Sequence, residues 1–249
     1  MRIGIPSWTG FIHAFIVALL ITPGMSAQTA GQRPAASAAR DLSGIWMSGG
    51  SMSDGAAGRR FSLEEPPLQP WALEKYRAAR EGIDPGQGGR NELDPNYYCF
   101  PPGPARSMLM PNPFEIVQSA AVMYFLFEFN SGIRRIYLDQ QEHPADVAET
   151  WMGHSIGRWD GDTLVADTVG MREETWLDRV GTPHSAALRI IERFRRLRRE
   201  TLEVVFQFED PQAFTRPWGG TKQYDLQTIG ITTEYVLCEE HLEMGKSRQ

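Results

Sequence analysis

The stretch SIGRWDGDTLVADTV, residues 155–169, decides the fold class of this 249-residue chain. Two strand-like runs, residues 155–159 and 163–169, lie on either side of the step Asp160-Gly161. Asp-Gly favours a tight hairpin, because type I′ turns need a positive φ that glycine adopts without steric cost. The stretch therefore predicts an antiparallel β-hairpin.

A second hairpin is predicted over residues 188–208, with its turn near residues 198–200. In residues 201–208 every second side chain is apolar, which is the pattern of a half-buried strand. Residues 188–197 could also form the apolar face of a helix. Their partner is so clearly β-like that we expect a strand.

Further short strands are expected along the chain, at residues 41–47, 114–119, 122–129, 133–138, 222–226 and 232–237. Many short strands with tight turns and little helix are typical of an antiparallel barrel or sandwich. A barrel of about 8–10 strands is wide enough to hold one small ligand. We therefore expect a single all-β domain over residues 41–249.

Two segments depart from the β pattern. Residues 70–80 are predicted to form a short helix, because proline suits its first turn and Gly82 suits its end. Leu73 and Tyr76 would share its buried face. Residues 94–113 are rich in proline, which excludes a central strand. We expect them to form an ordered extended segment that lies across the barrel.

The N-terminus has the pattern of a signal peptide over residues 1–27. The apolar run Phe11–Ile21 ends at a Pro-Gly step, and cleavage is expected after Ala27. The run is shorter than the roughly 20 residues of a membrane span. Residues 28–40 read as a flexible spacer. The pattern predicts a periplasmic or secreted, soluble protein without a transmembrane anchor.

Beyond the leader, the only cysteines are Cys99 and Cys238. In an oxidising compartment such a pair favours one disulfide bond. The alternatives are two buried free thiols or a catalytic thiol, although no His or Lys near Cys99 in the sequence would lower its pKa.

Composition narrows the range of partners. The net charge of −6 gives no long-range attraction for nucleic acid. No His-x-His, His-Glu-x-x-His or Cys-x-x-Cys spacing occurs, so we expect no metal site. Because neither a Gly-x-Ser-x-Gly elbow nor a Gly-rich phosphate loop occurs, we expect no serine-hydrolase activity and no cofactor. The oligomeric state stays open.

Several motifs carry a family resemblance: YCFPPG (98–103), PFEIVQ (113–118), TWMGHS (150–155), GRWDGDTL (157–164), TWLD (175–178), and PHS (183–185) followed by ERF (192–194). With them, residues 95–240 resemble a widespread family of exported Gram-negative bacterial proteins. The resemblance implies export and a calycin-like (lipocalin-like) fold, and it implies no reaction.

The candidate chemistry lies in loops that contain Trp, Asp and His. His154 or His184 would act as general base, because histidine exchanges protons near neutral pH, and Asp178 would orient it. Trp151 and Trp176 would form the walls of a pocket at the barrel mouth. The alternative is that these side chains are hydrogen-bonded anchors of their loops.

We add four further residues to the ligand-binding set, namely Arg158, Ser185, Glu192 and Tyr124. Glu192 sits in an apolar strand, where a carboxyl group facing inward is costly unless it is paired or protonated. It could pair with Arg135 or Arg193, act as an acid with a raised pKa, or face solvent.

Three functions follow from these features. The first is the binding of a small hydrophobic or aromatic molecule inside a lipocalin-like barrel. The second is a cofactor-free acid–base enzyme on the same scaffold, such as an isomerase, hydratase or lyase. The third is an envelope scaffold protein without a pocket.

Overall fold

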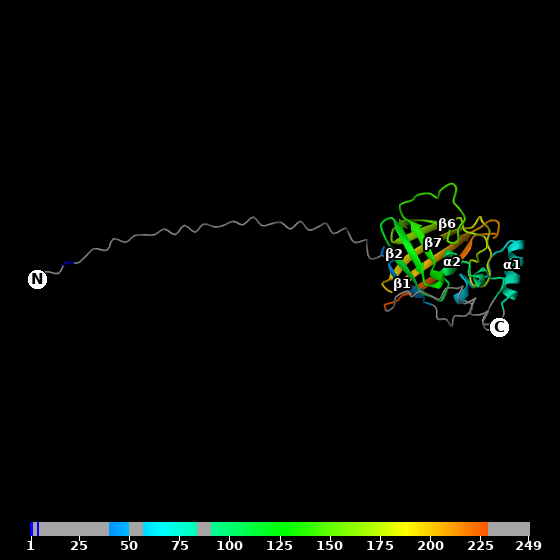
Figure 1. Ribbon diagram of the computed structural model, residues 1–249, viewed down its shortest axis with the longest axis horizontal. Helices are drawn as coiled ribbons and strands as arrows, with labels where there is room; N and C mark the ends of the chain where they lie inside the picture. The colour runs from blue at the N-terminus through cyan, green and yellow to red at the C-terminus, as the bar shows by residue number, and fades with distance from the viewer. Residues whose placement is uncertain (2–3, 5–39, 50–56, 84–90, 229–249) are drawn as a thin grey trace. The chain divides into compact units, whose positions relative to one another are not determined.

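The computed structural model describes Met1, Gly4 and residues 40–49, 57–83 and 91–228. Nine strands in these ranges form one closed barrel, in which each strand bonds to the next and β9 bonds back to β1 (Figure 1). They are β1 (Gly44–Ser48), β2 (Phe114–Gln118), β3 (Val122–Phe127), β4 (Ile133–Tyr137), β5 (His154–Asp160), β6 (Thr163–Val169), β7 (Arg189–Arg198), β8 (Thr201–Glu209) and β9 (Trp218–Leu226). The predicted all-β barrel is confirmed.

Several predictions fall outside the described residues. They concern the signal peptide, nearly all of the spacer, the strand over residues 232–237 and the disulfide partner Cys238. The elements of the barrel all belong to one unit of the chain, residues 36–249.

The predicted hairpin of residues 155–169 is present as β5 and β6. Their pairing runs to Asp160↔Thr163, so Gly161 and Asp162 form the loop. Gly161 has a φ of 58°, and Asp162 has no positive φ. A positive φ at the first central residue alone matches a type II′ turn, not the expected type I′ turn. Glycine is needed here because a side chain would strain this conformation.

The second predicted hairpin is present as β7 and β8, which pair from Arg189↔Glu209 to Arg198↔Thr201. Ile190, Glu192 and Phe194 are fully buried, whereas Ile191 and Arg193 between them face outward. The prediction of a strand rather than a helix over residues 188–197 is therefore confirmed.

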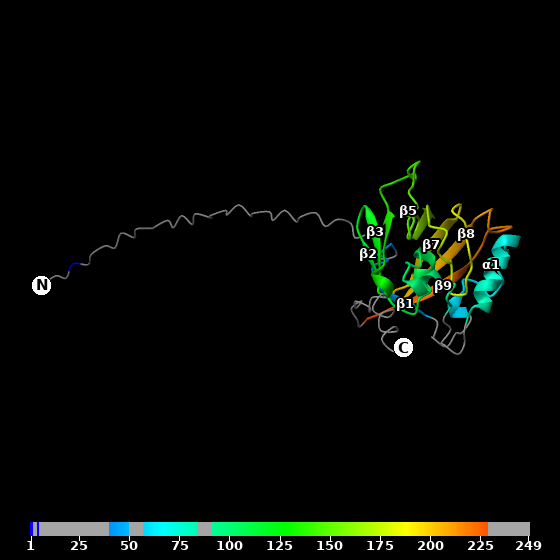
Figure 2. The ribbon, with the colours of Figure 1, turned by 45° about the vertical axis from the view of Figure 1, so that its right-hand side comes forward.

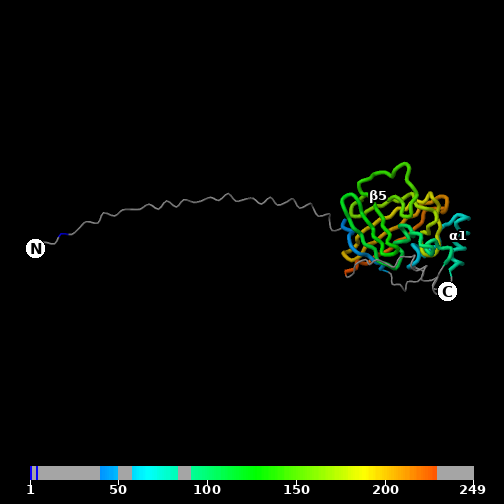
Figure 3. The backbone as a smooth tube through the Cα atoms, viewed as in Figure 1, coloured from blue at the N-terminus to red at the C-terminus, as the bar shows by residue number. Residues whose placement is uncertain are grey.

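The expectation of a wholly antiparallel barrel is wrong at one place. Strands β4 and β5 run parallel and share only two register pairs, Ile136↔Ser155 and Tyr137↔Ile156. A parallel pair needs a crossover of a dozen residues or more. Residues 138–153 supply it and arch away from the wall beside β5 (Figure 3).

Side chains fill the barrel interior. Every strand contributes an inward residue that is at most 2% exposed, from β1 to β9 Trp46, Phe114, Phe125, Ile136, Ser155, Leu164, Phe194, Phe206 and Tyr224. Small barrels are often packed in this way. The described part of the barrel therefore leaves no room inside for the small ligand that we expected there.

The proline-rich segment, which we expected to be extended, contains two short helical turns. It forms the 3₁₀ turn η4 (Pro95–Tyr98) and the single-turn helix α2 (Pro104–Ser107). All four residues of α2 are buried. Just after it, the Met108 carbonyl accepts a hydrogen bond from the Tyr224 hydroxyl at 3.2 Å. The segment thus packs against the core of the barrel.

Helix α1 (Pro70–Glu81) begins and ends as predicted, with Gly82 as its C-cap. Its buried face holds Ala72, Tyr76 and Ala79, and Leu73 is only partly covered. The helix lies beside β8 (Figure 2), where Trp71 Nε1 donates to the Gln212 carbonyl at 2.8 Å. Two further 3₁₀ turns complete the described elements, η2 (Ala57–Arg59) and η5 (Phe129–Ser131).

Candidate functional site

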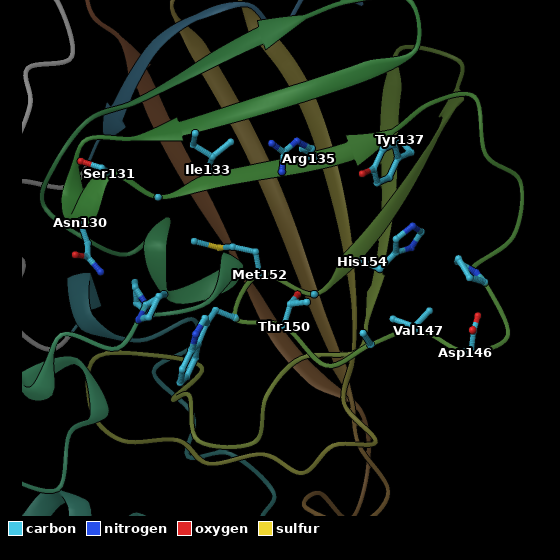
Figure 4. Close-up of a pocket in the computed structure, with 17 residues that line it drawn as sticks. Asn130, Ser131, Ile133, Arg135, Tyr137, Asp146, Val147, Thr150, Met152 and His154 are labelled. Atoms are coloured by element: carbon cyan, nitrogen blue, oxygen red, sulfur yellow. The ribbon is translucent and has the colours of Figure 1, made fainter.

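A cavity of about 630 Å³ lies on the flank of the barrel, between the outer face of β4 and the segment that leads into β5 (Figure 4). Most of its wall is apolar, formed by Pro101, Pro102, Ile133, Pro144, Val147, Ala148, Trp151 and Met152. Its polar side chains include Arg135, Tyr137, Asp146, Thr150 and His154. We call this space the flank cavity.

The register of β4 builds one wall of the flank cavity. Side chains alternate along a strand, so Arg134 and Ile136 point into the core. Ile133, Arg135 and Tyr137 therefore point outward, to the cavity.

Aromatic stacking holds the opposite wall. Trp151 stacks on Phe100, with ring centroids 5.1 Å apart and an interplanar angle of 19°. The Arg172 guanidinium lies 4.6 Å from the Trp151 ring centroid. Stacking and cation–π contacts of this kind fix the ring. Trp151, which we expected in the wall of a pocket at the barrel mouth, lines this cavity on the flank.

His154, which lines the flank cavity, is one of a pair of contacting histidines. Nδ1 of His143 lies 2.8 Å from Nδ1 of His154, so one nitrogen carries the shared proton and the other accepts it. The Tyr137 ring stacks on His154, with centroids 5.2 Å apart. His154 was a predicted candidate, and its partner is His143.

Asp167 decides which nitrogen holds the proton. Its carboxylate takes two hydrogen bonds from Arg189, at 2.9 and 2.6 Å. Burial raises the pKa of Asp167, but Arg189 and His143 outweigh it and the net pKa is lowered. The ionised carboxylate lies 3.7 Å from His143 Nε2. At that distance its field favours a proton on Nε2.

The proton on His143 Nε2 sets the tautomer of the next ring. In the tautomer with the His143 proton on Nε2, the Nδ1 lone pair of His143 accepts the Nδ1 proton of His154. His154 is left with an unprotonated Nε2, and this atom has no hydrogen-bond partner among the described residues. Burial lowers the pKa of His154, and the nearby charge of protonated His143 lowers it further. Near neutral pH, His154 is therefore a neutral base.

The structure does not bring His184 or Asp178 to this site. His184 is buried in the loop before β7, where its Nδ1 donates to the Ser185 carbonyl at 2.9 Å and its Nε2 meets Thr175 Oγ1 at 2.7 Å. Burial lowers the pKa of His184. Asp178 accepts hydrogen bonds from its own loop, including both the amide and the hydroxyl of Thr182. Neither histidine is a partner of Asp178.

Ser185 and Trp176 also anchor loops. The Ser185 hydroxyl donates to Asp210 at 2.8 Å, and its amide donates to the same carboxylate at 2.6 Å. Trp176 lies under the Arg106 guanidinium, which is 5.5 Å from its ring centroid. Neither residue lines the flank cavity.

Glu192 faces inward and is fully buried, but its partner is neither Arg135 nor Arg193. Arg134, from β4, donates hydrogen bonds to both carboxylate oxygens of Glu192 across the barrel. Its Nη1 lies 2.9 Å from Oε1. The remaining donors of Arg134 reach Ser155 and Thr168 at 3.3 and 2.9 Å. This satisfied network belongs to the core, and not to an open site.

Tyr124 and Arg158 lie on the outer face of the barrel. Tyr124 stands beside the cavity residue Arg135, whose guanidinium is 5.9 Å from the tyrosine ring centroid. Arg158 lines a different groove, over β5, β6 and β7.

Neither His143 nor Asp167 was named as a site residue from the sequence. The alternation of side chains along β6 could have identified Asp167, because it places this carboxylate on the same outward face as Val165 and Val169.

Neither a scan against protein-family models nor a search of curated proteins found a match.

In the described part of the chain, no helix has the length and apolarity of a membrane span. Within the same ranges, no group of three or more His, Cys, Asp or Glu side chains could hold a metal ion.

Proposed function

We propose that the chain is exported and that its barrel binds a small, largely apolar molecule, preferably aromatic, in the flank cavity. The observation that carries this proposal is a mostly apolar cavity of about 630 Å³ that has His154 among its lining residues. Pockets that bind small molecules measure about 300–1,000 Å³ and combine apolar walls with a few convergent polar groups.

The chemistry of the cavity end selects the ligand. The Nε2 lone pair of His154 accepts a hydrogen bond, so it favours a hydroxyl donor. The flat rings of Tyr137 and Trp151 and the thioether of Met152 suit an aromatic body. An aromatic alcohol satisfies all of these groups together. Because large side chains pack the barrel interior, we propose the flank, and not the barrel axis where we first expected it, as the place of the ligand.

Calorimetric titration with 1-naphthol tests this proposal. Ala148 is exposed on the cavity wall, so Ala148→Trp fills the cavity without altering the core. Ala78 is equally exposed on α1 and serves as the matched control, Ala78→Trp. The wild type and the control should bind alike, and Ala148→Trp should bind at least about tenfold more weakly. Equal binding by all three proteins would contradict the proposal.

A second ligand without a hydroxyl group tests whether the 1-naphthol hydroxyl contributes to binding. 1-Methoxynaphthalene has the same rings but no donor, so it should bind about three- to tenfold more weakly than 1-naphthol, the equivalent of one net hydrogen bond. If the two ligands bind equally, His154 Nε2 is not their anchor.

The chain Asp167–His143–His154 supports acid–base catalysis as a second candidate function. A neutral imidazole oriented by a carboxylate through a second ring can take a proton from a bound carbon acid at Nε2 and return it to the same or a neighbouring atom. His154 would be the catalytic residue, with His143 and Asp167 as positioning residues.

Hydrogen–deuterium exchange of a model ketone distinguishes binding from acid–base catalysis, and it needs no known substrate. 2-Tetralone is a bicyclic ketone with acidic hydrogens beside its carbonyl. An acid–base enzyme should speed their exchange for deuterium in D₂O, and His154→Ala should reduce that rate by roughly 10²–10⁴-fold. Binding without faster exchange would leave binding as the function.

A further inference from the structure

A second hollow of about 590 Å³ lies on the outer face of β5, β6 and β7, under the start of the β4–β5 connection. Its floor is aliphatic, because Ile156, Val165 and Ile191 point outward here, with Leu138 beside them. Three arginines rise around this floor, namely Arg158, Arg189 and Arg193. We call this hollow the arginine groove.

The three arginines are not equivalent. Arg189 is neutralised by Asp167, which also lines the groove, and it lies 3.6 Å from Glu209. Arg158 and Arg193 are exposed, and neither guanidinium has a salt bridge or hydrogen bond to any residue that the structure describes. The groove therefore holds two uncompensated positive charges in a protein whose net charge is −6.

The register places these two charges opposite each other. Arg158 pairs with Val165, and Val165 pairs with Arg193, so the arginines flank one valine across three strands. Neighbouring strands are about 4.8 Å apart, which separates the two backbones by about 10 Å. Long arginine side chains can converge over that span on one anion, and guanidinium groups suit the planar, two-oxygen geometry of a carboxylate.

From this geometry we infer that the arginine groove binds a carboxylate with an apolar tail. The carboxylate lies between Arg158 and Arg193, and the tail covers the aliphatic floor. The two arginine charges account for the anionic group, and the outward-facing Ile156, Val165 and Ile191 of the groove floor account for the apolar tail. This site is separate from the flank cavity, because the two spaces share no lining residue.

Titration calorimetry with dodecanoate and dodecanol, both below their aggregation limits, tests the inference. Dodecanoate should bind more tightly than dodecanol, and Arg158→Gln/Arg193→Gln should weaken dodecanoate about tenfold or more. Arg195→Gln is the matched control, because Arg195 is exposed on β7 but does not line the groove. It should bind dodecanoate like the wild type.

Specific outcomes would overturn the inference. They are equal affinity for the acid and the alcohol, an unchanged affinity in the double variant, or an equal loss in Arg195→Gln. Ala148→Trp, which fills the flank cavity, should leave dodecanoate binding unchanged. A loss in that variant would assign the acid to the flank cavity, and so contradict the separate site.

Discussion

Nδ1 of His143 lies 2.8 Å from Nδ1 of His154, and the far side of His143 faces the carboxylate of Asp167. The crossover from β4 supplies His143, whereas His154 begins β5 and Asp167 lies on β6. The parallel step in the barrel brings these three groups together. An uninterrupted antiparallel hairpin would have no connection long enough to carry a histidine back over the wall.

The first prediction concerns the basicity of His154. His143→Asn removes the neighbouring charge that lowers the pKa of His154, so this pKa should rise toward its ordinary value of 6.5. The burial contribution remains, and the rise should therefore be partial. NMR titration of the imidazole signals measures it. A fall in the pKa of His154 would contradict the assigned network.

The tautomer gives a second, independent prediction. Near neutral pH, ¹⁵N spectra of the wild type should report His154 protonated at Nδ1 and His143 protonated at Nε2. Asp167→Asn removes the charge that fixes this order, and the spectra should then show a mixture of tautomers. The opposite assignment in the wild type would remove the free base from the flank cavity.

The buried pair Arg134–Glu192 predicts a non-additive effect on stability. Arg134→Met or Glu192→Leu leaves one buried charge without its partner and should lower the free energy of unfolding by about 3–5 kcal/mol. The double variant removes both charges and should recover most of that loss. Urea unfolding of all four proteins measures the cycle. Additive losses would show that the two residues act separately.

His184 should be important for stability and not for binding. His184→Ala leaves a cavity and removes the hydrogen bond between His184 and the Thr175 hydroxyl, and it should cost about 2–4 kcal/mol of unfolding free energy. 1-Naphthol binding at a temperature where the variant is folded should be unchanged. A selective loss of ligand affinity would instead place His184 in the binding site.

The same residue gives a pH dependence with a definite sign. The folded pKa of His184 is lowered from 6.5 by burial, so the unfolded chain binds more protons as pH falls below about that value. The free energy of unfolding should therefore decrease as pH falls from about 7.5 to about 5.5. His184→Ala should make this decrease smaller. An increase in stability on acidification would contradict the sign.

A disulfide bond between Cys99 and Cys238 remains a prediction from the sequence. Intact-mass measurement of the mature protein should show a chain that begins near Gln28 and lacks two hydrogens, which corresponds to one Cys99–Cys238 bond. Reduction should restore those two hydrogens. A mass with both thiols free would contradict the bond, and a retained leader would contradict export.

The sequence predicted the barrel well because local patterns specify its hairpins. The glycine at residue 161 and the alternation of residues 201–208 are visible without any tertiary information. The parallel step was not predictable in this way, because β4 and β5 meet through only two register pairs. The filled interior was missed because periodicity shows which face of a strand is inward, but not how large side chains from nine strands fit together.

The site was predictable only in part. His154 and Trp151 were found because loops that contain Trp, Asp and His are the composition expected at a binding site. Asp178 and His184 share that composition, but their polar atoms are satisfied within their own loop. Asp167 and His143 are 24 residues apart, and only the fold brings them within 3.7 Å of each other.

The most direct test compares two methionine methyl groups in ¹³C NMR spectra during titration with 1-naphthol. Met152 lines the flank cavity, and Met123 is fully buried in the barrel interior. We predict a saturable shift of the Met152 methyl signal and little change in that of Met123. A shift of Met123 with Met152 unchanged would place the ligand inside the barrel and contradict the flank cavity as the binding site.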